Sequence, residues 1–217
     1  MITLTEENYL KAILTISLKG DSTVSTNAIA HEISTSPASV SDMLKKLADK
    51  KFIKYQKYKG VKLNNLGKST AISILRRHRL WETFLVKKLD FNWSQVHEVA
   101  EQLEHIKSPE LIDKLDDFLG YPSFDPHGEP IPTKKGEIPK RSTIALSELQ
   151  AGQQGIVMGV NLDEVNFLDY LNKLNIKIGS LIKVIETEIF DQSLTIKMKK
   201  TKYHISNNVA KHILIKL

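Results

Sequence analysis

Two segments of this chain carry histidines and carboxylates at the spacing of a helical turn. His78 and Glu82 lie four residues apart, so they share one face of a helix. Four further residues share a face on a second segment: His97, Glu101, Glu104 and His105. Carboxylates are seldom buried without a partner, and a stripe of this composition would make a poor core. Metal ligation gives these side chains a reason to converge, whereas the competing interpretation is a solvated charged face.

The same residues fail the common patterns of metal catalysis. The chain has no cysteine, which excludes disulfides, iron–sulfur clusters and thiolate zinc sites. His97 and Glu98 begin an HExxH-like run, but position 101 is Glu101, so the second histidine is missing. A di-iron bundle needs two Glu-x-x-His motifs, and this helix has none. We therefore expect no enzyme, with a metallo-hydrolase as the rival class.

The charge of the chain is unevenly distributed around a formal net value of +6. Residues 1–90 hold 16 Lys and Arg against 8 Asp and Glu, residues 91–125 hold 2 against 8, and residues 126–217 hold 13 against 9. This fits a polyanion at the N-terminal end and a cation in the middle, although unevenly charged solvated faces would look the same. The sequence has no apolar run of ~20 residues and no signal peptide, so we expect a cytoplasmic location and no membrane partner.

The N-terminal third shows the periodicity of a winged helix-turn-helix. Apolar residues at helical spacing predict three helices, over residues 3–19, 25–33 and 38–50. Thr5 is the expected N-cap of the first, and Pro37 suits the first position of the third. Apolar and polar residues then alternate at 52–55 and 61–63, which predicts a β-hairpin, the wing.

In such a unit the start of the second paired helix meets base edges in the major groove, and lysines hold phosphates. The expected DNA contacts lie on this helix and at the hairpin tip: Ser36, Pro37, Ala38, Ser39, Ser41, Asp42, Lys45, Lys46, Tyr58 and Lys59. The alternative is a three-helix scaffold without a role at DNA.

The remaining sequence changes its periodicity after a linker rich in proline and glycine, at 120–141. Before it, helices are predicted over about 68–89, 94–106 (capped by Ser94) and 109–119. After it come short β-like runs at 155–160, 180–188, 194–198 and 202–205, with small helices at about 166–174 and 207–212. The predicted fold class is mainly α with a small β-barrel domain.

The order of these motifs resembles the diphtheria-toxin repressor family of metal-dependent regulators. The resemblance rests on five stretches and covers essentially the whole chain: Thr5–Leu10, Arg77–Glu82, Val96–Glu98, Glu104–His105 and Phe124–Pro132. It implies a winged-helix DNA-binding domain (1–70), a helical dimerisation and metal-binding domain (71–122), a Pro-rich linker (123–142) and an SH3-like, FeoA-type domain (143–217). It also implies a homodimer that represses transcription from palindromic operator DNA.

The resemblance further implies two metal sites per subunit. One would use His78, Glu82 and His97, completed by Glu164 or its neighbour Asp163. The other would use Asn8, Glu101, Glu104 and His105. The iron-responsive branch has sulfur ligands where this chain has Asn8 and Glu101, and hard oxygen ligands favour Mn(II). Mn(II) is therefore the expected corepressor. The alternatives are Fe(II) in the same family and a winged-helix regulator of an organic ligand.

Overall fold

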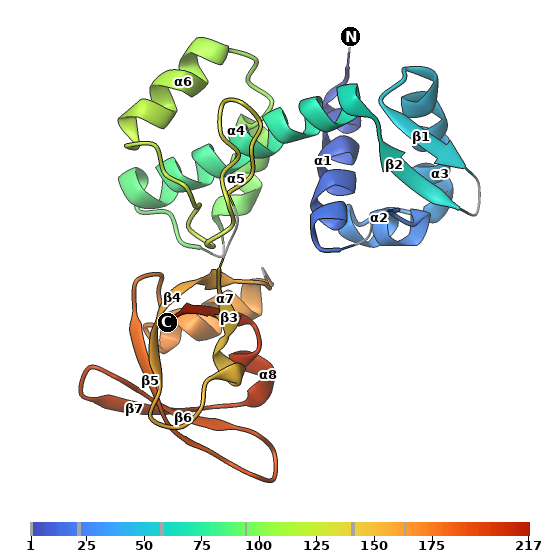
Figure 1. Cartoon of the computed structure of the whole chain (residues 1–217). Coiled ribbons are helices and arrows are strands. Elements are labelled where there is room, and N and C mark those ends of the chain that lie inside the picture. The colour runs from blue at the N-terminus through green and yellow to red at the C-terminus, as the bar shows by residue number, and fades with distance from the viewer. Residues whose placement is uncertain (1, 21–22, 57–58, 94, 140–141, 163) are drawn as a thin grey trace. The chain divides into compact units, whose positions relative to one another are not determined.

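The computed structural model describes the chain except for residues 1, 21–22, 57–58, 94, 140–141 and 163 (Figure 1). The expectations for Tyr58, Ser94 and Asp163 thus lie outside the described residues. The chain divides into two compact units, described here one at a time. The first comprises residues 1–78, 102–108 and 132–137, and the second comprises residues 79–101, 109–131 and 138–217. The four segment limits expected from the sequence (1–70, 71–122, 123–142 and 143–217) differ in kind from these two units and remain predictions.

The first unit contains the expected three helices and hairpin. Its elements are α1 (Leu4–Leu18), α2 (Thr26–Glu32), α3 (Pro37–Asp49), β1 (Ile53–Gln56), β2 (Gly60–Leu63) and the start of α4 (Asn65–Leu89). Strands β1 and β2 pair antiparallel, from Ile53 opposite Leu63 to Gln56 opposite Gly60. Pro37 is at the N-terminal start of α3, as predicted, and Ser36 caps that helix. The winged helix-turn-helix is therefore confirmed in its elements.

The prediction of Thr5 as the cap of α1 was wrong. Thr3 is the N-cap, because its side chain accepts from the backbone N–H of Glu6 while the Glu6 carboxylate accepts from the backbone N–H of Thr3. This reciprocal capping box satisfies two N–H groups that a helix start otherwise leaves open. The helix therefore begins at Leu4, and its cap lies two residues before Thr5.

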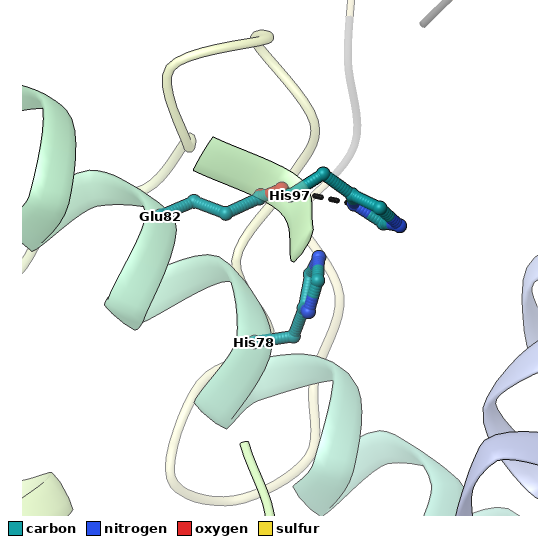
Figure 2. Close-up of side chains that lie close together, drawn as sticks. All are labelled: His78, Glu82 and His97. Carbon is teal, nitrogen blue, oxygen red and sulfur yellow. Dashed lines mark hydrogen bonds and ion pairs between the residues drawn. The ribbon is translucent and has the colours of Figure 1, made fainter. Parts of the chain in front are cut away.

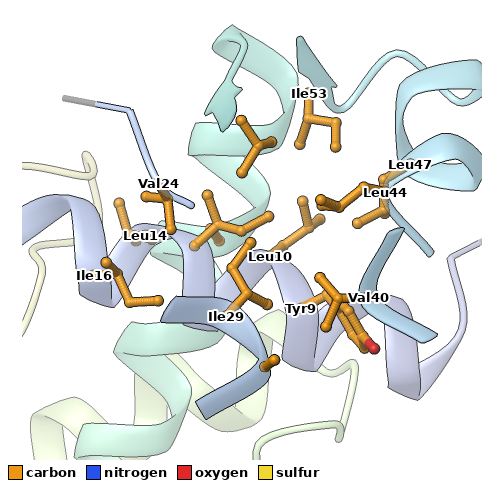
Figure 3. Close-up of a cluster of buried hydrophobic side chains, with 14 of the residues drawn as sticks. Tyr9, Leu10, Leu14, Ile16, Val24, Ile29, Val40, Leu44, Leu47 and Ile53 are labelled. Carbon is orange, nitrogen blue, oxygen red and sulfur yellow. The ribbon is translucent and has the colours of Figure 1, made fainter. Parts of the chain in front are cut away.

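A single apolar core holds the first unit together (Figure 3). Leu10 and Leu14 of α1, Val40 and Leu44 of α3 and Ile29 of α2 are each at most 1% exposed. These positions follow the helical spacing read from the sequence, so one face of each helix is buried. The face of α3 opposite this core is exposed in the N-terminal half of the helix.

The second unit begins with the later part of α4, followed by α5 (Val96–Leu103) up to Glu101 and by α6 (Pro109–Phe118). The described part of α5 is shorter than the predicted 94–106, since it ends at Leu103. A six-stranded antiparallel sheet then forms, in the order β3-β8-β4-β5-β6-β7. Its elements are β3 (Ile144–Ala145), β4 (Gln154–Val160), β5 (Leu181–Thr187), β6 (Leu194–Met198), β7 (Thr201–Ile205) and β8 (Ile213–Lys216), with η1 (Leu146–Glu148), α7 (Val165–Lys173) and α8 (Asn207–Ala210) between them.

Strands β3 and β8 were not predicted from the sequence. Strand β8 nevertheless lies inside the sheet, because it pairs with β3 on one side and with β4 on the other. A register shift between Val157 and Gly159 bends β4 where it faces β8. The predicted helix at 207–212 is the shorter α8 (Asn207–Ala210).

Candidate metal centre

Glu82 is the centre of a group of four potential ligands in the second unit. We call this the Glu82 group: Glu82, His97, Asp125 and His127. Glu82 is 2% exposed, and one of its carboxylate oxygens, Oε1, lies 3.4 Å from His97 Nδ1 and 3.8 Å from His127 Nδ1. His97 Nε2 in turn lies 3.6 Å from Glu101 Oε1. A buried carboxylate with two imidazoles beside it has the donor chemistry of a divalent metal site.

Two sets of three ligand atoms meet around this carboxylate. In one, single atoms of His78, Glu82 and His97 lie within 4.8 Å of one another, and Figure 2 shows the three side chains converging from α4 and α5. In the other, atoms of Glu82, Asp125 and His127 meet the same limit, and all three residues are buried. The first set contains the three expected ligands, whereas the second was not foreseen.

A tight turn presents Asp125 and His127. The Oδ1 of Asp125 accepts hydrogen bonds from the backbone N–H groups of His127 and Glu129, both at 2.8 Å. Phe124 and Pro130 pair across the base of the turn. These bonds fix Oδ1, and Oδ2 lies 3.5 Å from Arg79 Nε. The turn thereby holds a carboxylate and an imidazole two residues apart.

Gly128 lets this turn approach β4 closely. Its φ is +79°, and a Cβ built there would lie 1.9 Å from the carbonyl oxygen of Met158. Only glycine accepts both the positive φ and the close backbone approach. The carbonyl of His127 also accepts a hydrogen bond of 2.9 Å from the backbone N–H of Val160. The position of His127 is thus fixed by β4.

The electrostatics of the Glu82 group favour a cation. Burial and then the negative charge of Glu82 raise the pKa of Asp125 to about 6, and Arg79 and His127 only partly offset this. Two carboxylates in one buried site resist joint ionisation unless positive charge is added. The residues present therefore fit a divalent metal ion of the kind that oxygen and imidazole ligands hold.

Glu104, an expected ligand, lies in a second cluster, within the first unit. We call this the Glu104 cluster: Glu7, Lys11, His78, Glu104 and His105. Glu104 is fully buried, and its Oε2 lies 2.8 Å from Lys11 Nζ and 2.6 Å from His78 Nδ1. Burial raises the pKa of Glu104, but the His78 hydrogen bond and the Lys11 charge outweigh burial, so the pKa is below its ordinary value. His105 Nδ1 lies 2.7 Å from Glu7 Oε2.

The other expected ligands lie outside the two sets of three ligand atoms around Glu82. The Oδ1 of Asn8 and the Oε1 of Glu104 are buried and have no hydrogen-bond partner in the described structure, which leaves two oxygens able to receive a cation. Glu164 is exposed at the N-cap of α7 and makes no side-chain capping bond. Among the described residues, neither of the two sets of three histidine or carboxylate ligands includes Glu101, Glu104, His105 or Glu164.

The expected DNA-reading residues form an exposed face at the start of α3. Ser36, Pro37, Ala38 and Ser39 are all exposed, as are Lys45, Lys46 and Lys59. Two expected base readers already have local partners, since Ser39 bonds the capping Ser36 and Asp42 pairs with Lys45 at 3.0 Å. Ser41 donates to the carbonyl of Pro37. Of the candidate phosphate contacts, Lys46 and Lys59 form no ion pair within the part of the chain that the structure describes.

Comparison with known proteins finds matches over nearly the whole chain. Residues 1–61 match the iron-dependent repressor N-terminal DNA-binding domain, residues 64–133 match the iron-dependent repressor metal-binding and dimerisation domain, and residues 144–217 match the FeoA domain. A manganese-dependent transcriptional repressor solved in complex with manganese is 30% identical, with a TM-score of 0.84 over 97% of this chain and 98% of that one. The chain belongs to the diphtheria-toxin repressor family of metal-dependent transcriptional repressors.

Other members of the family are similar at the same level. The manganese regulator SloR is 32% identical, with a TM-score of 0.74 over 97% of both chains. The iron-dependent repressor IdeR of Mycobacterium tuberculosis is 28% identical over 167 residues, which is 74% of this chain and 72% of that protein. The family therefore includes relatives named for manganese and relatives named for iron.

Two chlamydial relatives are much longer than this chain. A probable metal transport system membrane protein of Chlamydia trachomatis is 43% identical over 72 residues, which is 33% of this chain but 16% of that protein. Its counterpart in Chlamydia pneumoniae is 46% identical over 77 residues, or 17% of its length. In the part of the present chain that the structure describes, no helix has the length and apolar character needed to cross a membrane.

Sequence reasoning missed Asp125 and His127 as potential ligands. They lie in a loop, where no helical spacing points to them, and they reach Glu82 only through the fold. A usable signal was present, because an aspartate and a histidine flank a proline and precede a glycine at 125–128. Such a turn fixes two ligand types at short range.

Proposed function

We propose that this repressor uses Mn(II) as its corepressor and that the Glu82 group is its principal metal site. The observation that carries the proposal is the buried convergence of Glu82, Asp125 and His127, with His97 at the edge. The ligands are oxygen and imidazole nitrogen, and the chain has no cysteine to favour a softer metal. Four of the solved relatives are named for manganese.

A bound divalent cation would supply the positive charge that lets Glu82 and Asp125 ionise side by side. Glu82 binds from α4, which begins directly after the wing strand β2. Asp125 and His127 bind from the turn that Gly128 anchors to β4. These ligands thus come from elements far apart in the sequence, and their joint engagement favours one arrangement of the chain over others.

We propose that the favoured arrangement is the one that binds operator DNA. Ser39 and its neighbours at the start of α3 would meet base edges, and Lys45, Lys46 and Lys59 would contact phosphates. In a homodimer with two-fold symmetry, paired α3 helices would read a palindrome with half-sites about one turn of DNA, ~34 Å, apart. Metal would then act as a corepressor through its higher affinity for this state.

A second, weaker metal site is proposed at Asn8, Glu101, Glu104 and His105. The unpartnered Oδ1 of Asn8 and Oε1 of Glu104 support it. Asn8 is a neutral ligand and Lys11 already neutralises Glu104, so this site offers less negative charge than the Glu82 group. The proposal is therefore one tight and one weaker site per subunit.

Fe(II) is the second candidate corepressor, since a 28% identical relative is named as an iron-dependent repressor. The residues of the Glu82 group are compatible with both ions, because carboxylate and imidazole bind both. Anaerobic titrations with Mn(II) and Fe(II), each followed by DNA binding, decide between them. A regulator of an organic ligand would show DNA binding that responds to neither ion.

The decisive experiment measures metal-dependent DNA binding by fluorescence anisotropy. The probe is a duplex selected from a random library with the Mn(II)-loaded full-length protein. Glu82→Gln should reduce the apparent Mn(II) affinity by at least about 100-fold, because it removes a charged ligand at the centre of the site. Glu98→Gln changes an exposed glutamate on the same helix as His97 and is the matched control. Equal Mn(II) dependence in both variants would exclude the Glu82 group as the sensing site.

Two histidine variants separate the alternative ligand sets around Glu82. His97→Ala should weaken Mn(II) most if His78, Glu82 and His97 hold the ion. His127→Ala should weaken it most if Glu82, Asp125 and His127 hold it. The imidazole of His97 is 52% exposed and that of His127 is 9% exposed, so we expect the larger loss from His127→Ala.

A further inference from the structure

We infer that Lys11 is an internal cation that competes with metal for Glu104 and so sets the affinity of the second metal site. This rests on the second site proposed above and deepens it, because it names a residue that governs the filling of that site. The residue is on α1, three positions after Asn8, and its side chain points at the carboxylate that a metal there would need.

The contact between Lys11 and Glu104 is short and buried. Lys11 Nζ lies 2.8 Å from Glu104 Oε2, and the side chains are 11% and 0% exposed. Lysine is almost never buried unless it is paired, so its burial here depends on the carboxylate. Removing one partner of such a pair leaves an uncompensated charge in a largely buried site.

The other contacts of Glu104 show which oxygen is taken. Its Oε2 lies close to both Lys11 Nζ and His78 Nδ1, the latter at 2.6 Å, while Oε1 has no hydrogen-bond partner in the described structure and lies 3.9 Å from His105 Nε2. The backbone carbonyl of Glu104 accepts from Arg77 Nε, which holds the segment in place. A metal ion on this carboxylate would face the Lys11 ammonium at close range. Since two cations repel strongly where water is excluded, binding requires that Lys11 leave.

The Glu82 group differs in this respect. The cation beside its carboxylates is Arg79, whose Nε lies 3.5 Å from Asp125 Oδ2, a longer contact than the 2.8 Å between Lys11 and Glu104. Arg79 also bonds Glu129 at 3.1 Å and the carbonyl of Pro130, so its charge is shared among several acceptors. Metal therefore fills the Glu82 group first, and the Glu104 cluster only when Lys11 is displaced.

The test counts bound Mn(II) by the electron paramagnetic resonance signal of the free ion during titration of the full-length protein. Lys11→Met keeps the length of the side chain and removes its charge. We expect the second Mn(II) equivalent to bind tighter in Lys11→Met by about tenfold or more, the size of the coupling between close charges in desolvated sites. The first equivalent should be unchanged. Lys19→Met removes an exposed lysine from the end of the same helix and should change neither equivalent.

Two further variants keep the inference testable if Lys11→Met folds poorly. Lys11→Gln is neutral but still donates to Glu104 and should show the same tightening. In the double variant Lys11→Met/Glu104→Gln both charges are gone, and the tight second equivalent should disappear. A thermal melt gives an independent readout, since Mn(II) should raise the melting temperature of Lys11→Gln more than that of the parent protein.

An unchanged second equivalent in both Lys11 variants would overturn the inference. Persistence of the tight equivalent in the double variant would also overturn it, because the added ion would then not be bound by Glu104. These outcomes differ from failure of the proposed function, which would appear as DNA binding independent of Mn(II) in the parent protein. Lys11 variants with one unchanged metal equivalent and Mn(II)-dependent DNA binding would reject only the role of Lys11.

Discussion

At the scale of single residues, the two buried carboxylates Glu82 and Glu104 show two ways of stabilising negative charge inside a protein. Glu104 has lysine and histidine neighbours at 2.8 and 2.6 Å, and its pKa is below the ordinary value. Glu82 lies near two imidazoles at longer distances and raises the pKa of Asp125. The difference indicates that the negative charge of Glu104 is compensated by side chains of the protein itself, whereas the site of Glu82 is suited to an added cation.

Glu6 provides a prediction on stability and pH. Its carboxylate lies 2.7 Å from Lys50 Nζ and completes the capping box with Thr3. Burial raises the pKa of Glu6, but the bonds from Lys50 and Thr3 outweigh it, so the pKa is lowered in the folded protein. A lowered pKa contributes stability above the unfolded pKa of about 4.5, and this contribution is lost as the pH falls through the folded pKa.

Glu6→Gln should therefore destabilise the metal-free protein at pH 7 by about 1 kcal/mol. The difference from the parent protein should shrink steadily below pH 4.5. Urea unfolding followed by circular dichroism at a series of pH values measures it. Lys50→Met should show the same loss at pH 7, and the double variant should lose little more than either single one. A difference that stays constant down to pH 3 would contradict this account.

Several individual residues could be predicted from the sequence and others could not. His78, Glu82 and His97 were identified because helical spacing is a local property, and the structure does bring their ligand atoms within 4.8 Å. Asp125 and His127 were missed because their approach to Glu82 depends on the folding of a loop. The pairing of Lys11 with Glu104 was also out of reach, since 93 residues separate them.

At the scale of elements, α3 is an exposed helix start that is held rigid by its cap. The Ser36 side chain accepts from the backbone N–H of Ser39, and Pro37 fixes the first turn. Val40, Leu44 and Leu47 bury the opposite face in the core. Exposed lysines on such a helix should contribute to DNA affinity through phosphates rather than through base sequence.

Lys46→Ala should accordingly weaken binding to all duplexes by a similar factor. It should also reduce the slope of log affinity against log salt concentration by about one. Anisotropy titrations of specific and random duplexes between 50 and 200 mM salt (about the range over which this effect is large) provide the measurement. Lys87→Ala, an exposed lysine in the last turn of α4, is the control. A loss confined to the specific duplex would instead place Lys46 at a base.

Gly128 gives the second prediction at this scale. Gly128→Ala adds a Cβ that would lie 1.9 Å from the Met158 carbonyl oxygen, in a backbone with φ of +79°. The turn must move away from β4, carrying Asp125 and His127 with it. We expect Mn(II) affinity to fall by about tenfold or more, as misplacing the support of metal ligands does. Isothermal titration calorimetry measures it.

Gly152→Ala separates backbone strain from close approach. Gly152 has a similar φ of +89°, but a Cβ there would meet nothing within 4 Å. The variant should lose stability through strain, about 1 kcal/mol or more, and keep its Mn(II) affinity. Equal losses of Mn(II) affinity in the two variants would show that contact with β4 does not position the ligands.

The elements themselves were largely predictable, with informative exceptions. Helices α1 to α4 and the wing follow from strong local periodicity. Strand β8 was missed because its three consecutive apolar residues, Ile213 to Ile215, carry no periodicity of their own, and its role arises from pairing with both β3 and β4. Likewise, Thr5 was predicted as the cap of α1, whereas the reciprocal cap joins Thr3 and Glu6.

At the scale of the whole molecule, one chain carries both the metal ligands and the DNA-binding helices. The proposed metal ligands of the Glu82 group come from separate elements of that chain. The helix α4 contributes to both compact units, since the division falls between His78 and Arg79. If metal favours the DNA-binding arrangement, the coupling is a free energy and must act in both directions. Operator DNA should then raise the affinity for Mn(II) by the same factor by which Mn(II) raises the affinity for DNA.

This reciprocity is the sharpest test of the regulatory mechanism. Saturating operator duplex should lower the Mn(II) dissociation constant of the first equivalent by about 5- to 150-fold, the usual range of such coupling, and the factor should equal the gain in DNA affinity with Mn(II). Free-ion resonance titrations with and without duplex give one side of the cycle, and anisotropy gives the other. A random duplex of equal length should give a smaller factor in both. If operator DNA left Mn(II) affinity unchanged while Mn(II) still improved apparent DNA binding, the metal would be acting on protein assembly rather than on the arrangement of the DNA-reading helices.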